Sequence, residues 1–338
     1  MKNKKILILG SKEDFSIEKM YERSFKKLSS KVNLFHTYDI RKSLISRFMW
    51  KYFKFINFIF IRKKIIKYIV NSSKKYDLII IFKGLYINKD FLSEIKKKSN
   101  DSKIINIFTD DPFKINYFKD ISNKNILETI PYFDHIFIYS RVILKKLRRK
   151  YPKNRFSYLP FGYDSVVHKN LKQKRNNTVK YDLSFIGTAD DERYEIIKRL
   201  NEFKIILAGN GWNKYELGKN ITYVQEVNFK NFSKLLKISK VSLNILRKQN
   251  KNSHNMKTFE IPSMGGLMIT NRTFEQNFYF PENKASLMYS NINELKLKIR
   301  KINNFYKKNN KIKKISNTIV KKHSYIERVK YLLGKIYE

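Results

Sequence analysis

The residues best suited to chemistry lie in the stretch 253–271, where a charged pair precedes a pair of glycines. Lys257 and Glu260 are three residues apart, so a helix would place both side chains on one face. Gly265 and Gly266 stop such a helix and let a ligand approach the backbone closely. A carboxylate accepts hydrogen bonds from ribose hydroxyls, while a cation and a helix N-terminus attract a diphosphate. The stretch therefore predicts a pocket for a nucleotide sugar; an ordinary helix–glycine–strand corner with a surface ion pair is the alternative.

Glycines recur directly after predicted strands in the second half of the chain: Gly187 follows one strand, and Gly209 and Gly211 follow the next. Arg193 stands near the start of a predicted helix, from where it could reach a diphosphate. A surface arginine paired with Glu192 or Asp190 is the alternative. Ligands of open parallel sheets bind beyond the carboxyl ends of the strands, so these residues are candidate donor contacts. No GxGxxG or P-loop motif is complete, which argues against a dehydrogenase or a kinase.

Two adjacent carboxylates, Asp110 and Asp111, follow a predicted strand in the first half of the chain. Pro112 favours an extended conformation at Asp111, so we expect the two side chains to diverge. One of them could act as the general base for an acceptor hydroxyl, or could orient that hydroxyl. A turn or N-cap aspartate is an equally good interpretation of each residue taken singly. A metal site would need more oxygen ligands than the sequence identifies.

Five histidines are scattered along the chain without zinc-ligand spacing, and there is no cysteine. His135 lies in an apolar run, which favours a buried structural histidine. His168 and His254 are expected to be exposed, and His254 is a candidate neighbour of the donor. Ser253 is the expected N-cap of the helix that carries the charged pair. The sequence also has no GxSxG motif, so nothing points to a serine or thiol nucleophile.

The composition of the 338-residue chain predicts a folded protein of two domains, with 42% hydrophobic residues. The formal net charge of +43 should attract polyanions, but lysines are spread along the whole chain instead of clustering on one element. We therefore interpret most of this charge as solvated surface and expect no specific nucleic-acid partner. The lack of cysteine favours a reducing compartment, and no apolar run reaches the ~18 residues that a membrane span needs. A cytoplasmic location is expected.

Apolar runs alternate with amphipathic segments in both halves of the chain, which is typical of parallel sheets covered on both faces. Residues 169–180 contain almost nothing that could be buried and read as a linker. We predict an N-terminal Rossmann-like domain (1–168), a C-terminal one (181–317) and a helix (318–338) that packs back across the cleft. The expected strands are 6–9, 32–36, 77–82, 104–108, 135–139, 156–159, 183–186, 204–208, 221–224, 241–245 and 267–270. The expected helices between them are 16–28, 41–73 (one helix or a pair), 89–98, 142–150, 192–200, 229–238 and 292–306.

Residues 44–70 are rich in aromatic side chains, with seven of them between Phe48 and Phe60. An amphipathic helix packed against the first sheet is the favoured interpretation. The alternative is a peripheral contact with an anionic membrane, since basic residues such as Arg62 and Lys63 flank the aromatic ones. An enzyme with a lipid-linked acceptor would need such a surface.

Seven motifs span nearly the whole chain: FKG (82–84), TDDPF (109–113), FDHIFIYS (133–140), LPFGYD (159–164), DLSFIGT (182–188), AGNGW (208–212) and, the most specific, MKTFEIPSMGGLMIT (256–270). Together they resemble the CgeB-type, spore-maturation-like glycosyltransferases. The resemblance implies an α/β protein of the GT-B fold, with two Rossmann-like domains facing across a cleft. It also implies a nucleoside-diphosphate-sugar donor on the C-terminal domain, an acceptor on the N-terminal domain, and no metal or further cofactor.

Carried over by position, the resemblance assigns Glu260 as the ribose-binding glutamate. Related retaining enzymes have a second glutamate eight residues earlier, but that position is Asn252 here, which leaves the stereochemical outcome open. Lys257 stands where the family often has arginine, so it supplies charge without a bidentate fork. Gly265 and Gly266 match the family's glycine turn.

The leading hypothesis is a cytoplasmic glycosyltransferase, peripheral to the membrane at most, that moves a hexosyl or related sugar to a glycan, lipid-linked or protein acceptor. Surface glycan synthesis is its expected setting. Lys257 and Arg193 would balance the diphosphate charge, and Asp110 or Asp111 would act on the acceptor. A nucleotide-sugar epimerase or hydrolase on the same fold, and a non-catalytic polyanion-binding protein, remain the alternatives.

Overall fold

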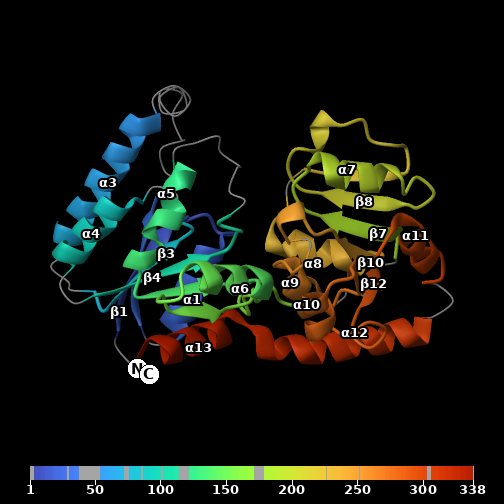
Figure 1. Ribbon diagram of the computed structural model, residues 1–338. Coiled ribbons are helices and arrows are strands. Elements are labelled where there is room, and N and C mark those ends of the chain that lie inside the picture. The colour runs from blue at the N-terminus through green and yellow to red at the C-terminus, as the bar shows by residue number, and fades with distance from the viewer. Residues whose placement is uncertain are drawn as a thin grey trace. The chain divides into compact units, whose positions relative to one another are not determined.

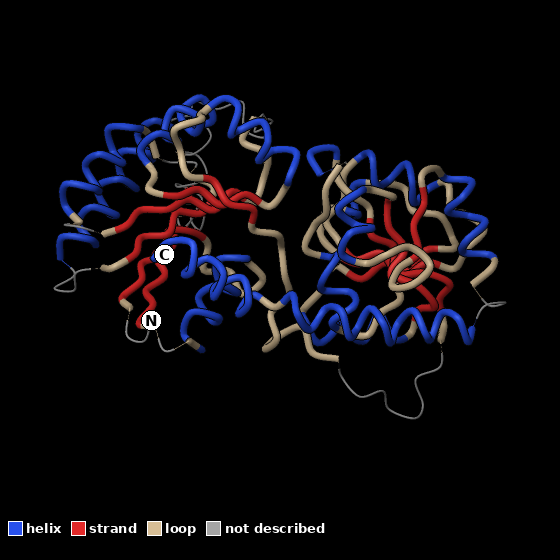
Figure 2. The backbone as a smooth tube through the Cα atoms, turned by 60° about the horizontal axis from the view of Figure 1, so that its bottom comes forward, coloured by secondary structure: helices blue, strands red, loops and turns tan. Residues whose placement is uncertain are grey.

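The chain forms two compact units, and each consists of one parallel sheet with helices on both faces (Figure 1, Figure 2). Unit 1 comprises Met1–Pro160 and Tyr325–Glu338, and unit 2 comprises Phe161–Ser324. The computed structural model describes residues 4–28, 30–37, 54–71, 76–84, 87–99, 102–113, 122–170, 179–225, 227–250, 252–302 and 306–337.

Six parallel strands build the sheet of unit 1, in the order β2-β1-β3-β4-β5-β6. Ile8 at its centre pairs with Leu34 on one side and Ile80 on the other, and all three are buried. Strands covered on both faces are apolar throughout instead of alternating, which is why the sequence marks them clearly. The strands are β1 (Lys5–Gly10), β2 (Lys31–His36), β3 (Leu78–Phe82), β4 (Lys103–Phe108), β5 (His135–Ile138) and β6 (Phe156–Tyr158).

The helices of unit 1 bury one apolar stripe each. In the first of them, Ser16 caps the N-terminus by accepting from the N–H of Lys19, and Met20, Tyr21 and Phe25 face the core. The helices are α1 (Ile17–Lys27), α3 (Lys54–Asn71), α4 (Lys89–Lys98), α5 (Ser122–Thr129), α6 (Arg141–Lys150) and α13 (Tyr325–Tyr337).

Unit 2 repeats the architecture, with six parallel strands in the order β12-β11-β10-β7-β8-β9. Phe185 and the fully buried Trp212 meet edge to face at the centre of its core. The strands are β7 (Tyr181–Ile186), β8 (Ile205–Ala208), β9 (Ile221–Val224), β10 (Ser239–Asn244), β11 (Met268–Asn271) and β12 (Leu287–Tyr289). The helices are α7 (Asp191–Lys198), α8 (Phe229–Lys237), α9 (Lys257–Ser263), α10 (Phe274–Tyr279), α11 (Ile292–Arg300) and α12 (Tyr306–Val320).

The first boundary between the units falls at Pro160, earlier than the predicted end of the N-terminal domain at residue 168. The N–H of Phe161 already donates to Nε2 of His254 (3.1 Å), which lies deep in unit 2. The predicted linker, 169–180, lies largely outside the described residues.

The last helix belongs to unit 1, so the chain enters unit 2 and returns. α13 packs against α1, and the ring centroids of Tyr21 and Tyr325 are 5.1 Å apart (Figure 1). Lys4, near the start of the chain, places its Nζ 4.7 Å from the ring centroid of Tyr337. The predicted C-terminal segment, 318–338, therefore divides between the end of α12 and α13.

Most predicted strands and helices agree with the structure to within two residues. The predicted helix 292–306 is wrong in extent, since it ends at Arg300, and α5, α10 and the three-residue strand β12 were not predicted. Of the aromatic segment, α3 is a helix as predicted, with Phe60 56% exposed, while residues 41–53 lie outside the described part. No helix among the described residues is both long and apolar enough to cross a membrane.

Candidate nucleotide-sugar site

The order of strands in unit 2 reverses between the neighbours β7 and β10. From β7 the chain runs outward through β8 and β9, then returns to β10 and runs outward on the other side through β11 and β12. Ligands of open α/β sheets bind at the carboxyl ends of such a pair of strands, because the loops leave them in opposite directions. The helix that follows β10 is α9, which packs against β10 and β11 and carries the charged pair.

The two glycines end α9 in a Schellman motif, in which two N–H groups cap the last helical carbonyls. The N–H of Gly266 donates to the oxygen of Ile261, and the N–H of Gly265 donates to that of Pro262, both at 3.0 Å. Gly265 has φ of 78°, and a Cβ there would lie 2.7 Å from Nδ2 of Asn170. The predicted helix stop is confirmed, and ligand contact at either glycine stays a prediction.

The start of α9 differs from the prediction, because Ser253 does not cap it. Oδ1 of Asn255 accepts from the N–H of Thr258 (3.2 Å), whereas the hydroxyl of Ser253 donates to Glu275 (2.7 Å). Asn255 also exchanges two amide hydrogen bonds with Asn244, the last residue of β10 (2.8 and 3.1 Å). These bonds tie the start of α9 to the carboxyl end of β10.

Lys257 and Glu260 form an ion pair, with Nζ 2.9 Å from Oε2. The other carboxylate oxygen, Oε1, lies 3.5 Å from Nε2 of His168, and Glu260 is only 3% exposed. Nζ of Lys257 also lies 4.2 Å from the ring centroid of Phe232, a cation–π contact. Burial alone would raise the pKa of Glu260, but the charges of Lys257 and His168 and the lysine hydrogen bond lower it overall. Glu260 is therefore an ionised acceptor at neutral pH.

His168 was missed as a site residue, and its predicted exposure is wrong, since it is 2% exposed. Its Nδ1 accepts from the N–H of Asp164 (2.9 Å), which leaves Nε2 to carry a ring proton toward Glu260. The side chain of Asp164 closes the same turn by accepting from the N–H of Val166 (2.8 Å). His168 and Glu260 are far apart in sequence, so spacing gave no signal for this contact.

His254 is also buried, with 0% exposure, and the prediction that it is exposed is wrong. Nε2 accepts from the N–H of Phe161 (3.1 Å), and Nδ1 donates to Oε2 of Glu275 (2.6 Å). Its ring packs edge to face on Phe259 at 5.5 Å. Because both ring nitrogens bind protein groups, the observed role of His254 is to fix the loop before α9. Contact with a donor stays a prediction.

Arg193 lies in the first turn of α7, at the strand reversal. Its guanidinium donates to the main-chain oxygens of Thr188 (2.8 Å) and Ile245 (3.3 Å), which follow β7 and β10, and lies 3.6 Å from Asp190. Arg193 therefore joins the two strand ends and brings a positive charge to them. Arg247, which the sequence reasoning missed, pairs with the same aspartate from the other side (Nε–Oδ2 3.2 Å).

The glycines after β7 and β8 allow the backbones of two loops to pack directly against each other. Gly209 has φ of 127°, and a Cβ on it would lie 2.5 Å from the oxygen of Gly187. Nε1 of Trp212 donates to that same oxygen (2.8 Å). Gly211 also has positive φ (86°), beside Ala189. Loop packing thus accounts for these glycines, and donor contact stays a prediction.

Unit 1 has its own reversal of strand order, between β1 and β3. Lys83, directly after β3, pairs with Asp110, which follows β4 (Nζ–Oδ2 2.8 Å), and both side chains are about a third exposed (36% and 29%). Asp111 is buried, and its Oδ1 accepts from the N–H of Phe113 (3.0 Å). The two side chains diverge as predicted: Asp110 stays accessible, while Asp111 holds the turn.

Glu18, in the first turn of α1, was not identified from the sequence. It is buried against Gly10, where an added Cβ would lie 2.4 Å from its Cγ. Burial raises the pKa of Glu18, although nearby N–H groups and the charge of Lys83 oppose the shift. A buried carboxyl with a raised pKa beside a cation is a candidate acid–base group. The sequence shows only an acidic residue in a first helical turn, which is too common to be a signal.

Among the residues that the structure describes, no group of three or more histidine or carboxylate side chains is placed to hold a metal ion. Residues 193–334 match the model of the family Glyco_trans_1_2, described as glycosyl transferase-like. This region starts at Arg193 and contains the whole of α9. No curated protein matches the sequence.

Solved structures share the fold over the full length of the chain. Sucrose-phosphate synthase from Thermosynechococcus elongatus has a TM-score of 0.70 at 11% identity, covering 99% of this chain and 98% of that one. Anabaena Alr3699/HepE with UDP-glucose has 0.66 at 10% identity, covering 98% and 99%. T4 phage BGT with UDP-glucose has 0.60 at 13% identity, covering 98% of each chain. At these identities the likeness establishes the fold alone, and the predicted GT-B fold is confirmed.

Proposed function

We propose that this chain of GT-B fold is a glycosyltransferase that binds a nucleotide-sugar on unit 2 and transfers the sugar to a hydroxyl group held by unit 1. The observation that carries the proposal is the ionised, buried Glu260 at the strand reversal of unit 2, with Lys257 bound to it. The match of residues 193–334 to a glycosyl transferase-like family supports the same conclusion.

The charged pair suits a ligand that offers hydroxyls and phosphates together. In the free protein, Lys257 compensates the charge of Glu260, which would otherwise be costly to bury. A ribose brings hydroxyl donors to the carboxylate, and the adjacent diphosphate brings oxygens to the ammonium group. Both groups then exchange partners without leaving a buried charge unpaired. Arg193 and Arg247 add positive charge near the diphosphate as it departs.

In the transfer step, the acceptor oxygen forms a bond to the anomeric carbon while the bond from that carbon to the diphosphate breaks. The electron pair leaves with the nucleoside diphosphate, and a base takes the hydroxyl proton. We assign that role to Asp110, because it is the accessible one of the two carboxylates that follow β4, and not to Asp111, which is engaged in its turn. Glu18 is the second candidate.

Binding of nucleoside diphosphates tests the proposal directly. Calorimetry with UDP, GDP, ADP and dTDP should find at least one ligand, with UDP first to try because HepE and BGT were solved with UDP-glucose. Glu260→Gln should weaken that ligand about 10- to 100-fold, the worth of a hydrogen bond to a charged group. The matched control is Glu195→Gln, an exposed glutamate on α7 of the same unit, which should change affinity less than about twofold. The donor site would be refuted if the two variants bound the ligand with equal affinity, or if neither the parent protein nor the variants bound any of the nucleotides.

Finer features of this activity rest on the resemblance to the CgeB-type enzymes and are proposed with it. They are a hexosyl or related sugar, catalysis without a metal, and a surface glycan as the product. The exposed apolar and basic residues of α3, such as Phe60 and Lys63, are consistent with a peripheral contact to anionic membrane near a lipid-linked acceptor. Turnover that persists in EDTA, and flotation of the protein with anionic vesicles, test two of these points separately.

A further inference from the structure

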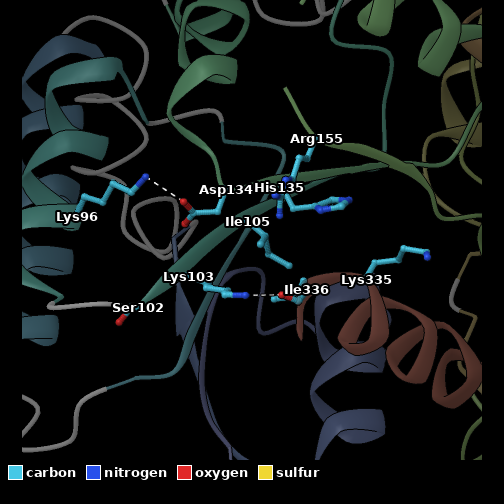
Figure 3. A pocket seen from close by; sticks show the side chains of 9 residues that line it. All are labelled: Lys96, Ser102, Lys103, Ile105, Asp134, His135, Arg155, Lys335 and Ile336. Atoms are coloured by element: carbon cyan, nitrogen blue, oxygen red, sulfur yellow. Dashed lines mark hydrogen bonds and ion pairs between the residues drawn. The ribbon is translucent and has the colours of Figure 1, made fainter. Parts of the chain in front are cut away.

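Unit 1 also has a cavity at the amino ends of its strands, whereas Asp110 lies at their carboxyl ends. Its volume is about 590 Å³, and it is bordered by the amino ends of β4 and β5, the residue before β6, α4 and the last turns of α13 (Figure 3). Lys103 starts β4 and Asp110 follows its other end, so the two are roughly 20 Å apart at the usual rise per strand residue. The cavity is therefore separate from the carboxyl edge of the same sheet, where Lys83 and Asp110 lie.

Positive side chains dominate the described lining, which contains one carboxylate, Asp134, and the four cations Lys96, Lys103, Arg155 and Lys335. Both oxygens of that carboxylate have partners in the protein: one pairs with Nζ of Lys96 (3.0 Å), and the other accepts from the N–H of Ile104 (2.7 Å). Figure 3 shows this pair at one end of the cavity and Lys335 at the other. The remaining lining carries an excess of three positive charges.

Contacts with the end of α13 hold the side chain of Lys103 in place. Its Nζ donates to the main-chain oxygen of Ile336 at the end of α13 and lies 4.8 Å from the ring centroid of Tyr337 (Figure 3). A cation at a helix C-terminus is favoured by the helix dipole. Lys103 is thus a positioned charge, unlike the solvated lysines elsewhere on the surface.

The pKa of His135 is sensitive to the positive charges around the cavity. This residue is 8% exposed, its ring stacks on Phe137 (4.5 Å), and Nε2 is bonded to the hydroxyl of Ser157 (2.9 Å). Burial, and then the charges of Arg155, Lys335 and Lys103, lower the pKa of His135 to about 4. Three cations from three separate segments therefore act on one buried ring, and the single carboxylate of the described lining is bonded to Lys96 and to the N–H of Ile104.

We propose that this basic cavity, formed by Lys103, Arg155 and Lys335 around His135, binds a phosphorylated ligand through a phosphate group of at least two negative charges. Phosphate oxygens match the fork of an arginine and the point charges of two lysines. The volume lies within the usual range for small-molecule sites, so a phosphate with an attached sugar- or nucleoside-sized group fits. The proposal does not depend on the donor site of unit 2.

The test uses the full-length protein with ring-labelled histidines, titrated with inorganic pyrophosphate at constant 150 mM KCl, and follows His135 by NMR. The His135 signal is identified by its loss in His135→Asn. We expect a saturable shift of this signal and a rise of about one unit in the pKa of His135, because a bound anion offsets the three cations. A His135 signal that does not respond, while pyrophosphate shifts other histidines, overturns the proposal.

Two double variants distinguish specific binding in the cavity from attraction by the overall positive charge of the chain. Arg155→Gln with Lys335→Gln should raise the dissociation constant measured at His135 at least tenfold; both residues are exposed, so folding should be preserved. Lys145→Gln with Lys146→Gln removes the same charge from exposed positions of α6 and should change the constant less than twofold. Equal weakening in the two variants would mean that only the overall field attracts the anion, and overturns the proposal.

The source of the phosphate is identified by competition against bound pyrophosphate. Displacement by glucose 6-phosphate, but not by vesicles that contain phosphatidic acid, supports the site as one for a soluble phosphate ester. The opposite result supports it as one for a lipid headgroup.

Discussion

Both units place a lysine–carboxylate pair at the carboxyl edge of a parallel sheet, but they bury it differently. In unit 1, Lys83 and Asp110 meet at 2.8 Å with both side chains about a third exposed. In unit 2, Lys257 and Glu260 meet at 2.9 Å with the carboxylate only 4% exposed. The same chemical pair is therefore solvent-accessible in one unit and has a buried carboxylate in the other.

This difference has an energetic reason. An exposed ion pair contributes little to stability, because water screens it and both side chains lose freedom. A buried carboxylate keeps its charge only when a partner compensates it, and breaking that pair is costly. Under the proposed function, unit 2 thus offers a buried carboxylate to the donor, whereas unit 1 offers an accessible carboxylate for proton transfer.

The largest effect should come from Asp110. Asp110→Asn should lower kcat by at least about 100-fold, the usual contribution of a general base, while nucleotide affinity stays within twofold. Steady-state rates with the cognate donor and acceptor, beside calorimetry of the nucleotide, measure the two quantities. Asp111→Asn is the matched control and should mainly lower stability, because it weakens the turn at Phe113. If Asp110→Asn keeps its rate while Glu18→Gln loses it, the base is Glu18.

The next effect concerns stability and tests the role of burial. Lys257→Met leaves Glu260 buried without its cation, so the free energy of unfolding should fall by about 3 kcal/mol. Lys83→Met removes the lysine of the exposed pair and should cost less than about 1 kcal/mol. Urea unfolding at pH 7 measures both. Equal losses in the two variants would contradict the contrast between the units.

The smallest effect is a difference in pH dependence between two buried glutamates. The pKa of Glu260 is lowered, so its contribution to stability is complete above about pH 4.5 and is lost as the pH falls through the folded value. The pKa of Glu18 is raised, so this carboxyl stays protonated to a higher pH in the folded state than in the unfolded state. The free energy of unfolding therefore decreases as the pH rises from about 4.5 through the folded pKa.

Glu260→Gln and Glu18→Gln should therefore change the pH slope of stability in opposite directions. Urea unfolding midpoints between pH 3 and 7 measure the slopes, with Glu195→Gln as the control. Slopes that change in the same direction would show that the two carboxyls have similar environments in the folded protein.

The sequence alone determined the architecture, because strands buried on both faces must be apolar throughout. LIIIF (78–82) is an example, and α4 begins and ends at the predicted residues, since Asn88 caps it and its apolar stripe has helical spacing. The sequence also placed Lys257 and Glu260 on one helix and marked its end by two glycines, because these are local relations three to six residues long.

Only the tertiary structure decided which polar residues meet and which are buried. His168 faces Glu260, Glu18 lies against Gly10, and His254 is enclosed by unit 2, although their neighbours in sequence gave no sign of it. The α13 helix likewise returns to α1 across almost the whole length of the chain. Burial and long-range contacts depend on how the elements pack, and packing sets the desolvation and the partner charges that determine what a side chain can do.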